Sequence, residues 1–231
     1  MSCRIKIEEY VDGLDNEDII FISKLYSEKF SKYSEGAFFK IMERMVKEKK
    51  LVRLSKGIYF KNSENYTYNV DTILNYYFGE NNDNGMYIGY QLYSKYGISD
   101  AIKDYFELYS TIVDQDKKNI GNIAISKVPM ELNYDNTRII EAFEILQNYD
   151  SIEKFSKEKF SIYARQFALG YNDESALRVL EKMKYKKSSI AFMKSILDMY
   201  RVDNSLGKYL NCASKYKIPK VSKVKWDQVY S

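Results

Sequence analysis

The chain has 231 residues, of which 45% are hydrophobic and 29% are charged, a balance typical of a globular protein with its own core. The absence of histidine excludes His-based catalytic triads and His metal sites, and two cysteines are too few for a tetrahedral thiolate zinc site. No apolar run reaches the length of a membrane span, and the start, MSCRIKIEEYVDG, lacks the apolar core of a secretory signal. We therefore expect a cytoplasmic protein that does not span a membrane and that binds no metal or cofactor.

The net charge of +4 is distributed unevenly along the chain. Residues 1–61 carry a net +3, residues 62–180 carry −7, and residues 181–231 carry +8. Within the first part, residues 32–61 hold nine basic and three acidic side chains. Basic segments attract phosphate backbones and acidic protein surfaces alike. At the C-terminal end an ordinary solvated, Lys-rich surface remains an equal alternative.

The first third of the chain predicts small alternating elements. A short helix is expected over residues 4–11, followed by a β-prone run at residues 19–22. Ser23 is a suitable cap for a second helix over residues 24–30, and residues 31–34 are expected to turn.

A third helix, from residue 35 to about residue 49, is clearly amphipathic, and Ser34 is a good N-cap for it. Its apolar face is formed by Phe38, Ile41, Met42 and Met45. The opposite face carries three cations, Lys40, Arg44 and Lys47. One side can therefore pack into a core while the other, led by Ser34, enters the major groove of a duplex and flanking cations hold phosphates.

Two β-prone runs follow, at residues 51–54 and 58–60, on either side of the tight turn at residues 55–57. Arg53 and Lys56 lie near the tip of this expected hairpin. A hairpin after a third helix is the wing of a winged helix-turn-helix, which touches the DNA backbone or minor groove. The alternative is a small helical domain that ends in a hairpin and binds no nucleic acid.

Two segments resemble the AbiEi antitoxins of abortive-infection, or type IV, toxin–antitoxin systems. The sequence FKIMERMVKEKKLVRLSKGIYF at residues 39–60 is similar to the family's recognition helix and wing. The sequence GMYIGYQLYSKYGIS at residues 85–99 is similar to a weaker element that follows the winged domain. The resemblance covers roughly residues 1–130 by motif and the remainder only by length and order.

The resemblance implies a two-domain antitoxin that also represses its own operon. Its winged domain would bind double-stranded operator DNA at inverted repeats, and its second domain would neutralise a nucleotidyltransferase-like toxin, with or without a stable complex. By position, the recognition helix would contribute Lys40, Arg44 and Lys47, and the wing Arg53 and Lys56. The family has no catalytic residues to transfer.

The remaining elements are predicted from periodicity. We expect a polar linker at residues 62–68, a short helix at residues 70–78, a loop at residues 80–85 and a second helix at residues 86–96. Two strands, at residues 104–113 and 120–128, are expected to pair as a β-hairpin. From residue 136 onward the pattern is helical. The expected helices include one capped by Asp173, one that starts at Ser188 or Ser189, and one over residues 206–216.

We therefore predict an α+β, mostly helical chain: a winged helix-turn-helix domain at residues 1–62, and a larger α-rich antitoxin domain at residues 63–231 that contains a β-hairpin or small sheet. Enzymatic activity is not expected, because no phosphate-binding loop is present. The acidic pairs Asp114/Asp116 and Asp173/Glu174 are explained by turn and cap positions.

Two other functions stay open. One is a winged-helix regulator without a toxin partner, whose C-terminal domain senses a ligand or dimerises. The other is a protein-interaction module whose winged domain binds protein rather than DNA. The basic helices and tail at residues 181–225 could contact an acidic partner or extend a DNA footprint, since electrostatic steering serves both.

Overall fold

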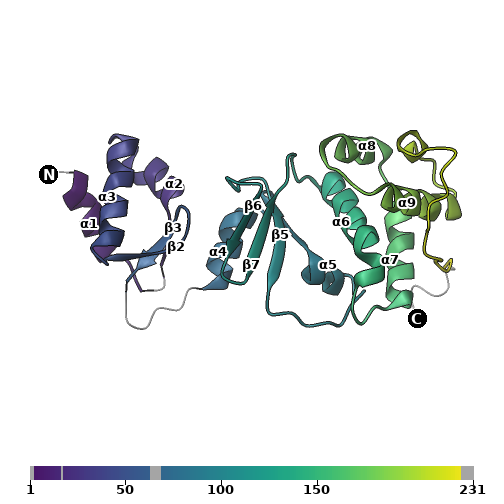
Figure 1. The fold of residues 1–231 in the computed structure, drawn as a ribbon, viewed down its shortest axis with the longest axis horizontal. Helices are drawn as coiled ribbons and strands as arrows, with labels where there is room; N and C mark the ends of the chain where they lie inside the picture. The colour runs from purple at the N-terminus through teal and green to yellow at the C-terminus, as the bar shows by residue number, and fades with distance from the viewer. Residues whose placement is uncertain (1–2, 17, 63–68, 225–231) are drawn as a thin grey trace. The chain divides into compact units, whose positions relative to one another are not determined.

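The computed structural model describes residues 3–16, 18–62 and 69–224 (Figure 1). About half of these residues are helical and two small sheets supply the strands, so the predicted α+β class is confirmed. The chain forms two compact units, one of residues 1–76 with residues 119–121 and one of the remainder. The predicted linker lies almost entirely at residues 63–68, outside the described residues.

The N-terminal unit alternates short helices and strands. In chain order it contains α1 (Cys3–Asp12), β1 (Ile19–Phe21), α2 (Ile22–Leu25), a π-helical turn (Tyr26–Phe30), α3 (Glu35–Lys47), β2 (Leu51–Ser55) and β3 (Ile58–Lys61). The three strands form one sheet in the order β1-β3-β2, and both pairings are antiparallel.

A single hydrophobic cluster holds this unit together. Amphipathic α1 and α3 each turn one stripe inward, and the sheet covers them. The members of this cluster that are buried to 1% exposure or less are Ile7, Val11, Phe38, Met42, Met45 and Leu51. Several of these side chains are large, and each contributes about 1.5–3 kcal/mol by leaving water.

The predicted order of helices and hairpin in the first sixty residues is confirmed, with one correction. The second helix begins at Ile22, one residue before the predicted cap Ser23. Phe21 occupies the N-cap position without a side-chain cap, and the backbone N–H of Ile22 donates to the carbonyl of Gly57 at 2.9 Å. The hairpin turn therefore caps the helix, a long-range contact that local sequence does not reveal.

The C-terminal unit follows α4 (Val70–Phe78), which is predicted correctly and runs across the division between the units. Its elements are β4 (Gly85–Ile88), α5 (Gly89–Lys95), β5 (Phe106–Ser110), β6 (Lys117–Ile120), β7 (Ile123–Lys127), α6 (Tyr134–Asn148), α7 (Lys157–Leu169), α8 (Asp173–Lys182) and α9 (Lys187–Met199). Short 3-10 turns follow α6 and α9, at Tyr149–Ser151 and Leu206–Tyr209.

The sheet of this unit has the strand order β4-β5-β7-β6. Strands β5 and β7 pair in parallel, with Phe106 opposite Ile123, so the predicted hairpin between residues 104–113 and 120–128 is wrong. The two-residue turn Gly121-Asn122 instead joins β7 to its sheet neighbour β6, and Gly121 takes the left-handed conformation with φ of 56°.

Three further predictions for this unit need correction. The helix expected at residues 86–96 begins as strand β4, because residues 85–88 pair with β5 and Gly89 breaks the strand with φ of 62°. The cap of α8 is Asn172, whose side chain accepts from the Ser175 N–H, rather than Asp173. The helix expected over residues 206–216 is only the short turn Leu206–Tyr209.

The helices α6 to α9 pack around a second hydrophobic cluster, to which β4, α5 and the residues just before α6 also contribute. In Figure 1, α6 and α7 lie beside α9 within this unit. The centre of α6 is buried on every side, including Ile140, Phe143 and Ile145 at 0% exposure. In the parts of the chain that the structure describes, no helix combines the length and hydropathy of a membrane span.

Candidate nucleic-acid interface

The exposed face of α3 gathers three of the predicted cations. Phe38, Met42 and Met45 are buried to 1% or less beneath the helix, whereas Lys40, Arg44 and Lys47 are exposed. At 3.6 residues per turn these two sets project in opposite directions. The amphipathic pattern therefore places a row of three cations along the solvent side of a helix anchored by its other side.

The side chains of these three cations make no ion pair or hydrogen bond with any residue in the described ranges. Other cations of the unit do: Lys24 pairs with Glu28 at 3.9 Å and Lys50 pairs with Glu8 at 3.1 Å. A long side chain that has no internal partner keeps its charge available for an external one. The α3 row is therefore electrostatically unsatisfied within the described unit.

A separate network ties up the cations near the end of α3. The Arg4 guanidinium donates to Glu8 and to Glu48, at 3.1 and 3.0 Å, and Lys50 donates to the same Glu8 carboxylate. The Lys50 hydrogen bond, followed by that of Arg4, lowers the pKa of Glu8. These groups link α1 to the end of α3, so they serve the fold rather than the exposed row.

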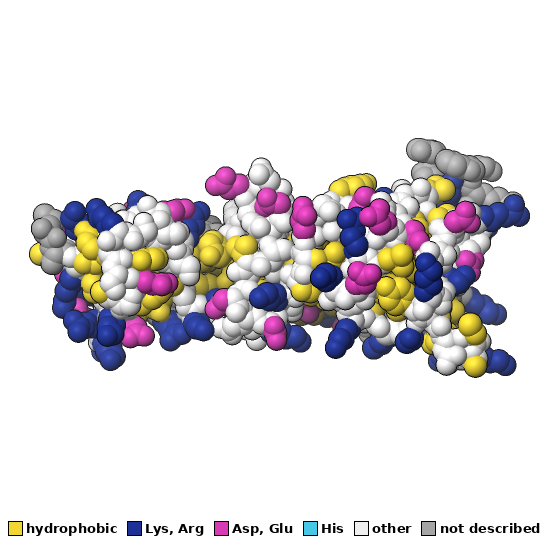
Figure 2. Space-filling view, turned by 90° about the horizontal axis from the view of Figure 1, so that it is seen from above, with side chains coloured by type: hydrophobic (Ala, Val, Ile, Leu, Met, Phe, Trp, Pro, Cys, Tyr) yellow, Lys and Arg dark blue, Asp and Glu magenta, His cyan; other side chains and the backbone are white. Residues whose placement is uncertain are grey.

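One carboxylate shares the exposed face with the row. Glu43 lies one residue before Arg44 and is also exposed, so the local charge of the face is +2 rather than +3. Figure 2 shows Lys and Arg side chains, in dark blue, spread over the N-terminal unit with few acidic ones among them. The face is basic without being uniformly so.

The leading end of α3 carries three small residues, of which Ser34 is predicted from the sequence and Gly36 and Ala37 are not. Ser34 is exposed at the N-cap position with an extended backbone, and its side chain makes no capping hydrogen bond. Gly36 and Ala37 follow on the same face as Lys40, and a Cβ added to Gly36 would meet nothing within 4 Å. Gly36 and Ala37 lie four and three residues before Lys40, and this helical spacing is the sequence signal that places them on the same face. Another molecule can therefore approach this end of the backbone closely.

The hairpin places the other two predicted residues on a separate element of the same unit. Gly57 closes the two-residue turn with φ of 77°, a conformation that favours glycine. Lys56 precedes it and is exposed. Arg53 lies on β2, exposed, with a long 3.4 Å contact from its Nε to the carbonyl of Ser55, where the strand register shifts. The structure thus groups the six predicted residues as Ser34 and three cations on α3 and two residues at the hairpin.

The acidic pairs that could suggest an Mg²⁺ site have internal roles. Asp114 accepts from Lys118 at 3.1 Å. Asp173 accepts from the Tyr171 hydroxyl at 2.9 Å and from the Ser205 N–H at 2.8 Å. Among the residues whose positions are described, no cluster of three or more metal-binding side chains occurs.

Comparisons with known proteins give little. No family model matches the chain, and no curated protein matches it. One similar solved structure is the crystal structure of the RV2827C protein from Mycobacterium tuberculosis, with 11% identity and a TM-score of 0.40 over 83% of this chain and 75% of that one. A likeness at this level supports no inference about fold family or function.

Proposed function

We propose that the N-terminal unit is a winged helix-turn-helix that binds double-stranded DNA, with α3 as its recognition helix and the β2–β3 hairpin as its wing. The order of the elements supports this assignment: a helix, a strand, two helices and then a hairpin that pairs with the first strand. A helix of about 10–12 Å diameter fits the major groove, which is about 12 Å wide.

The observation that carries the proposal is the unpaired row of Lys40, Arg44 and Lys47 opposite the buried face of α3. Phosphates supply the anions that this row lacks internally. The small residues Gly36 and Ala37 let the leading end of the helix approach base edges, and Arg53 and Lys56 would contact the adjacent backbone.

In this proposal the protein represses its own operon by covering a promoter that contains inverted repeats. The resemblance at residues 39–60 and 85–99 is the basis for a further role as the antitoxin of a type IV system, with a nucleotidyltransferase-like toxin as functional partner. No catalytic step is assigned to the chain.

The DNA-binding proposal is tested by fluorescence anisotropy with the full-length protein and two duplexes of equal length. One carries the region upstream of the protein's own gene, and the other a shuffled sequence. We expect tighter binding to the upstream duplex and a steep loss of affinity with salt, because phosphate neutralisation releases counterions. Absence of binding to both duplexes at low salt would refute the proposal.

The antitoxin role is tested separately by expressing the neighbouring gene product with and without the full-length protein. Growth arrest that is rescued by the wild-type chain and by a variant unable to bind DNA supports neutralisation. A neighbouring gene product that leaves growth unaffected, combined with intact operator binding, favours a regulator that has no toxin partner.

A further inference from the structure

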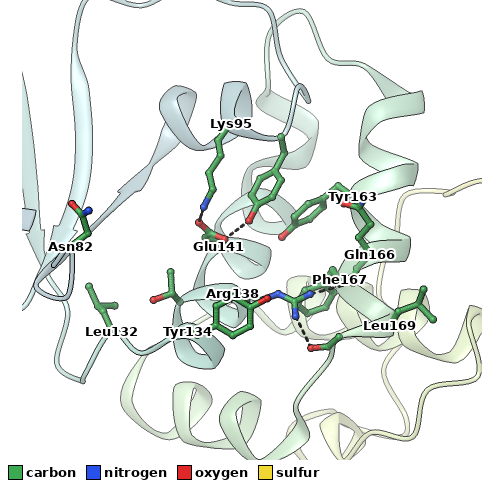
Figure 3. Close-up of a pocket in the computed structure, with 13 residues that line it drawn as sticks. Asn82, Lys95, Leu132, Tyr134, Arg138, Glu141, Tyr163, Gln166, Phe167 and Leu169 are labelled. Carbon is green, nitrogen blue, oxygen red and sulfur yellow. Dashed lines mark hydrogen bonds and ion pairs between the residues drawn. The ribbon is translucent and has the colours of Figure 1, made fainter. Parts of the chain in front are cut away.

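The C-terminal unit contains an open pocket between α5, α6 and α7, of about 700 Å³ (Figure 3). Pockets that hold small molecules are typically about 300–1,000 Å³, apolar, with a few converging polar groups. All of its lining residues belong to this one unit, so its shape does not depend on the N-terminal unit or on DNA.

The polar side of the pocket carries an excess of positive charge. Glu141 is 4% exposed, and its carboxylate accepts from the Lys95 Nζ at 2.6 Å and from the Tyr96 hydroxyl. Arg138 supplies a second cation, which donates to the carbonyls of Gly170 and Gln166 at 2.9 and 3.2 Å rather than to a carboxylate. Among the lining residues two cations therefore face one carboxylate, a balance that favours an anion.

A tyrosine hydroxyl without a partner in the described part of the chain lines the pocket. The side chain of Tyr163 is 6% exposed, and its hydroxyl has no hydrogen-bond partner among the residues that the structure describes. Figure 3 shows it extending from α7 into the pocket, on the side where Lys95 and Glu141 meet. Burial raises the pKa of Tyr163, so the hydroxyl remains a donor. The hydroxyl faces the space of the pocket, so an acceptor bound there would receive its hydrogen bond in place of solvent.

The remaining walls are apolar and rich in rings. Phe167 and Leu132 are buried in the wall, whereas Tyr134 and Leu169 are 75% and 57% exposed at the pocket. The guanidinium of Arg138 lies 5.5 Å from the centre of the Tyr134 ring. Aromatic walls favour a planar ring, which packs on them by offset or edge contacts.

We propose that this pocket binds a small aromatic carboxylate. The carboxylate accepts from Tyr163 and interacts with the ammonium of Lys95, and the ring packs against Phe167. This site is independent of the proposed DNA-binding function, since it shares no residue with α3 or the hairpin.

The test uses the full-length protein and 1-naphthoate as the probe, with binding measured by calorimetry. The uncharged 1-naphthamide has the same ring and is the matched ligand control. We expect saturable binding of naphthoate and about tenfold weaker binding of the amide, because a charge-assisted hydrogen bond is lost.

Tyr163→Phe removes only the unpartnered hydroxyl, and we expect about tenfold weaker naphthoate binding with thermal stability retained. Tyr185→Phe is the matched control, because Tyr185 lies outside the pocket, and it should bind naphthoate like the wild type. Absence of saturable naphthoate binding, equal affinity for the amide, or wild-type affinity in Tyr163→Phe would each overturn the proposal.

Discussion

Arg44 and Met45 are neighbours in α3 with opposite surroundings: the Met45 side chain is 1% exposed in the core, whereas Arg44 is exposed and unpaired within the described unit. Binding and folding can therefore be separated by mutation on this helix. Changes at Met45 act on stability, with about 2–5 kcal/mol lost on truncation to Ala. Changes at Arg44 leave the core intact.

The combined variant Lys40→Ala, Arg44→Ala, Lys47→Ala should lose DNA affinity while keeping its melting temperature near that of the wild type. If each cation neutralises one phosphate, the slope of log K against log salt falls by about 2.7, or about 0.9 per contact. Anisotropy titrations at several salt concentrations measure the slope, and thermal denaturation measures stability.

The matched control is Lys24→Ala, Lys29→Ala, Lys50→Ala, which removes the same net charge from the same unit. Lys24 and Lys50 pair with carboxylates, and Lys29 lies over the Tyr10 ring at 4.8 Å. We expect this control to keep most of the slope. An equal loss in both variants would mean that overall charge, rather than the α3 row, determines affinity.

Gly36→Glu should affect stability and DNA binding in opposite directions. Replacing an exposed glycine near the start of α3 adds helix propensity, and a carboxylate there interacts favourably with the helix dipole, for a gain of about 0.5–1.5 kcal/mol. The same carboxylate would lie at the leading end of the helix and repel phosphates. Gly36→Ala is the control, with a smaller gain in stability and little loss of affinity. Denaturant melts and anisotropy test both signs.

The sequence predicts elements that are defined by local periodicity, such as α3, whose inward and outward residues follow one repeat, and the β2–β3 hairpin, which surrounds Gly57. It fails where pairing between distant strands decides the structure. Residues 85–88, which are expected to lie in a loop and the start of a helix, form β4 by pairing with β5. The Gly121-Asn122 turn separates β6 from β7, so the strand that follows the turn pairs with β6 and, in parallel, with β5.

The same distinction holds for the candidate sites. The three α3 cations follow from spacing alone, whereas the pocket is lined by Lys95, Glu141 and Tyr163 from three different helices. No local pattern links residues separated in this way. Their proximity depends on the packing of α5 and α7 against α6, which only a three-dimensional structure supplies.

Gly57→Ala should destabilise the N-terminal unit by about 1–2 kcal/mol, because a residue with a Cβ is strained at a φ of 77°. The new Cβ would also lie 3.4 Å from the Ile22 Cγ2, at the start of α2. The opposite sign expected for Gly36→Ala makes the two glycines a matched pair. Chemical denaturation of both variants tests this; a stabilised Gly57→Ala would mean that the turn conformation is assigned wrongly.

Glu144→Gln should flatten the dependence of stability on pH. Burial raises the pKa of Glu144 above its usual value near 4.5, the nearby Glu107 carboxylate adds to the rise, and the hydrogen bond from the Tyr109 hydroxyl opposes it. Above the usual pKa the folded chain holds a proton that the unfolded chain has lost, so stability falls as pH rises through the raised pKa. The amide cannot ionise, yet it can still accept from Tyr109.

Denaturant melts of the wild type and of Glu144→Gln, from about pH 4.5 toward neutrality, measure this difference. We expect the wild type to lose more stability over that range than the variant does. Glu158→Gln is the control, because Glu158 is exposed at the start of α7 and should give the wild-type curve. Parallel curves for the wild type and Glu144→Gln would contradict this prediction. They would mean that the surroundings of Glu144 stabilise its charged form enough to offset the effect of burial.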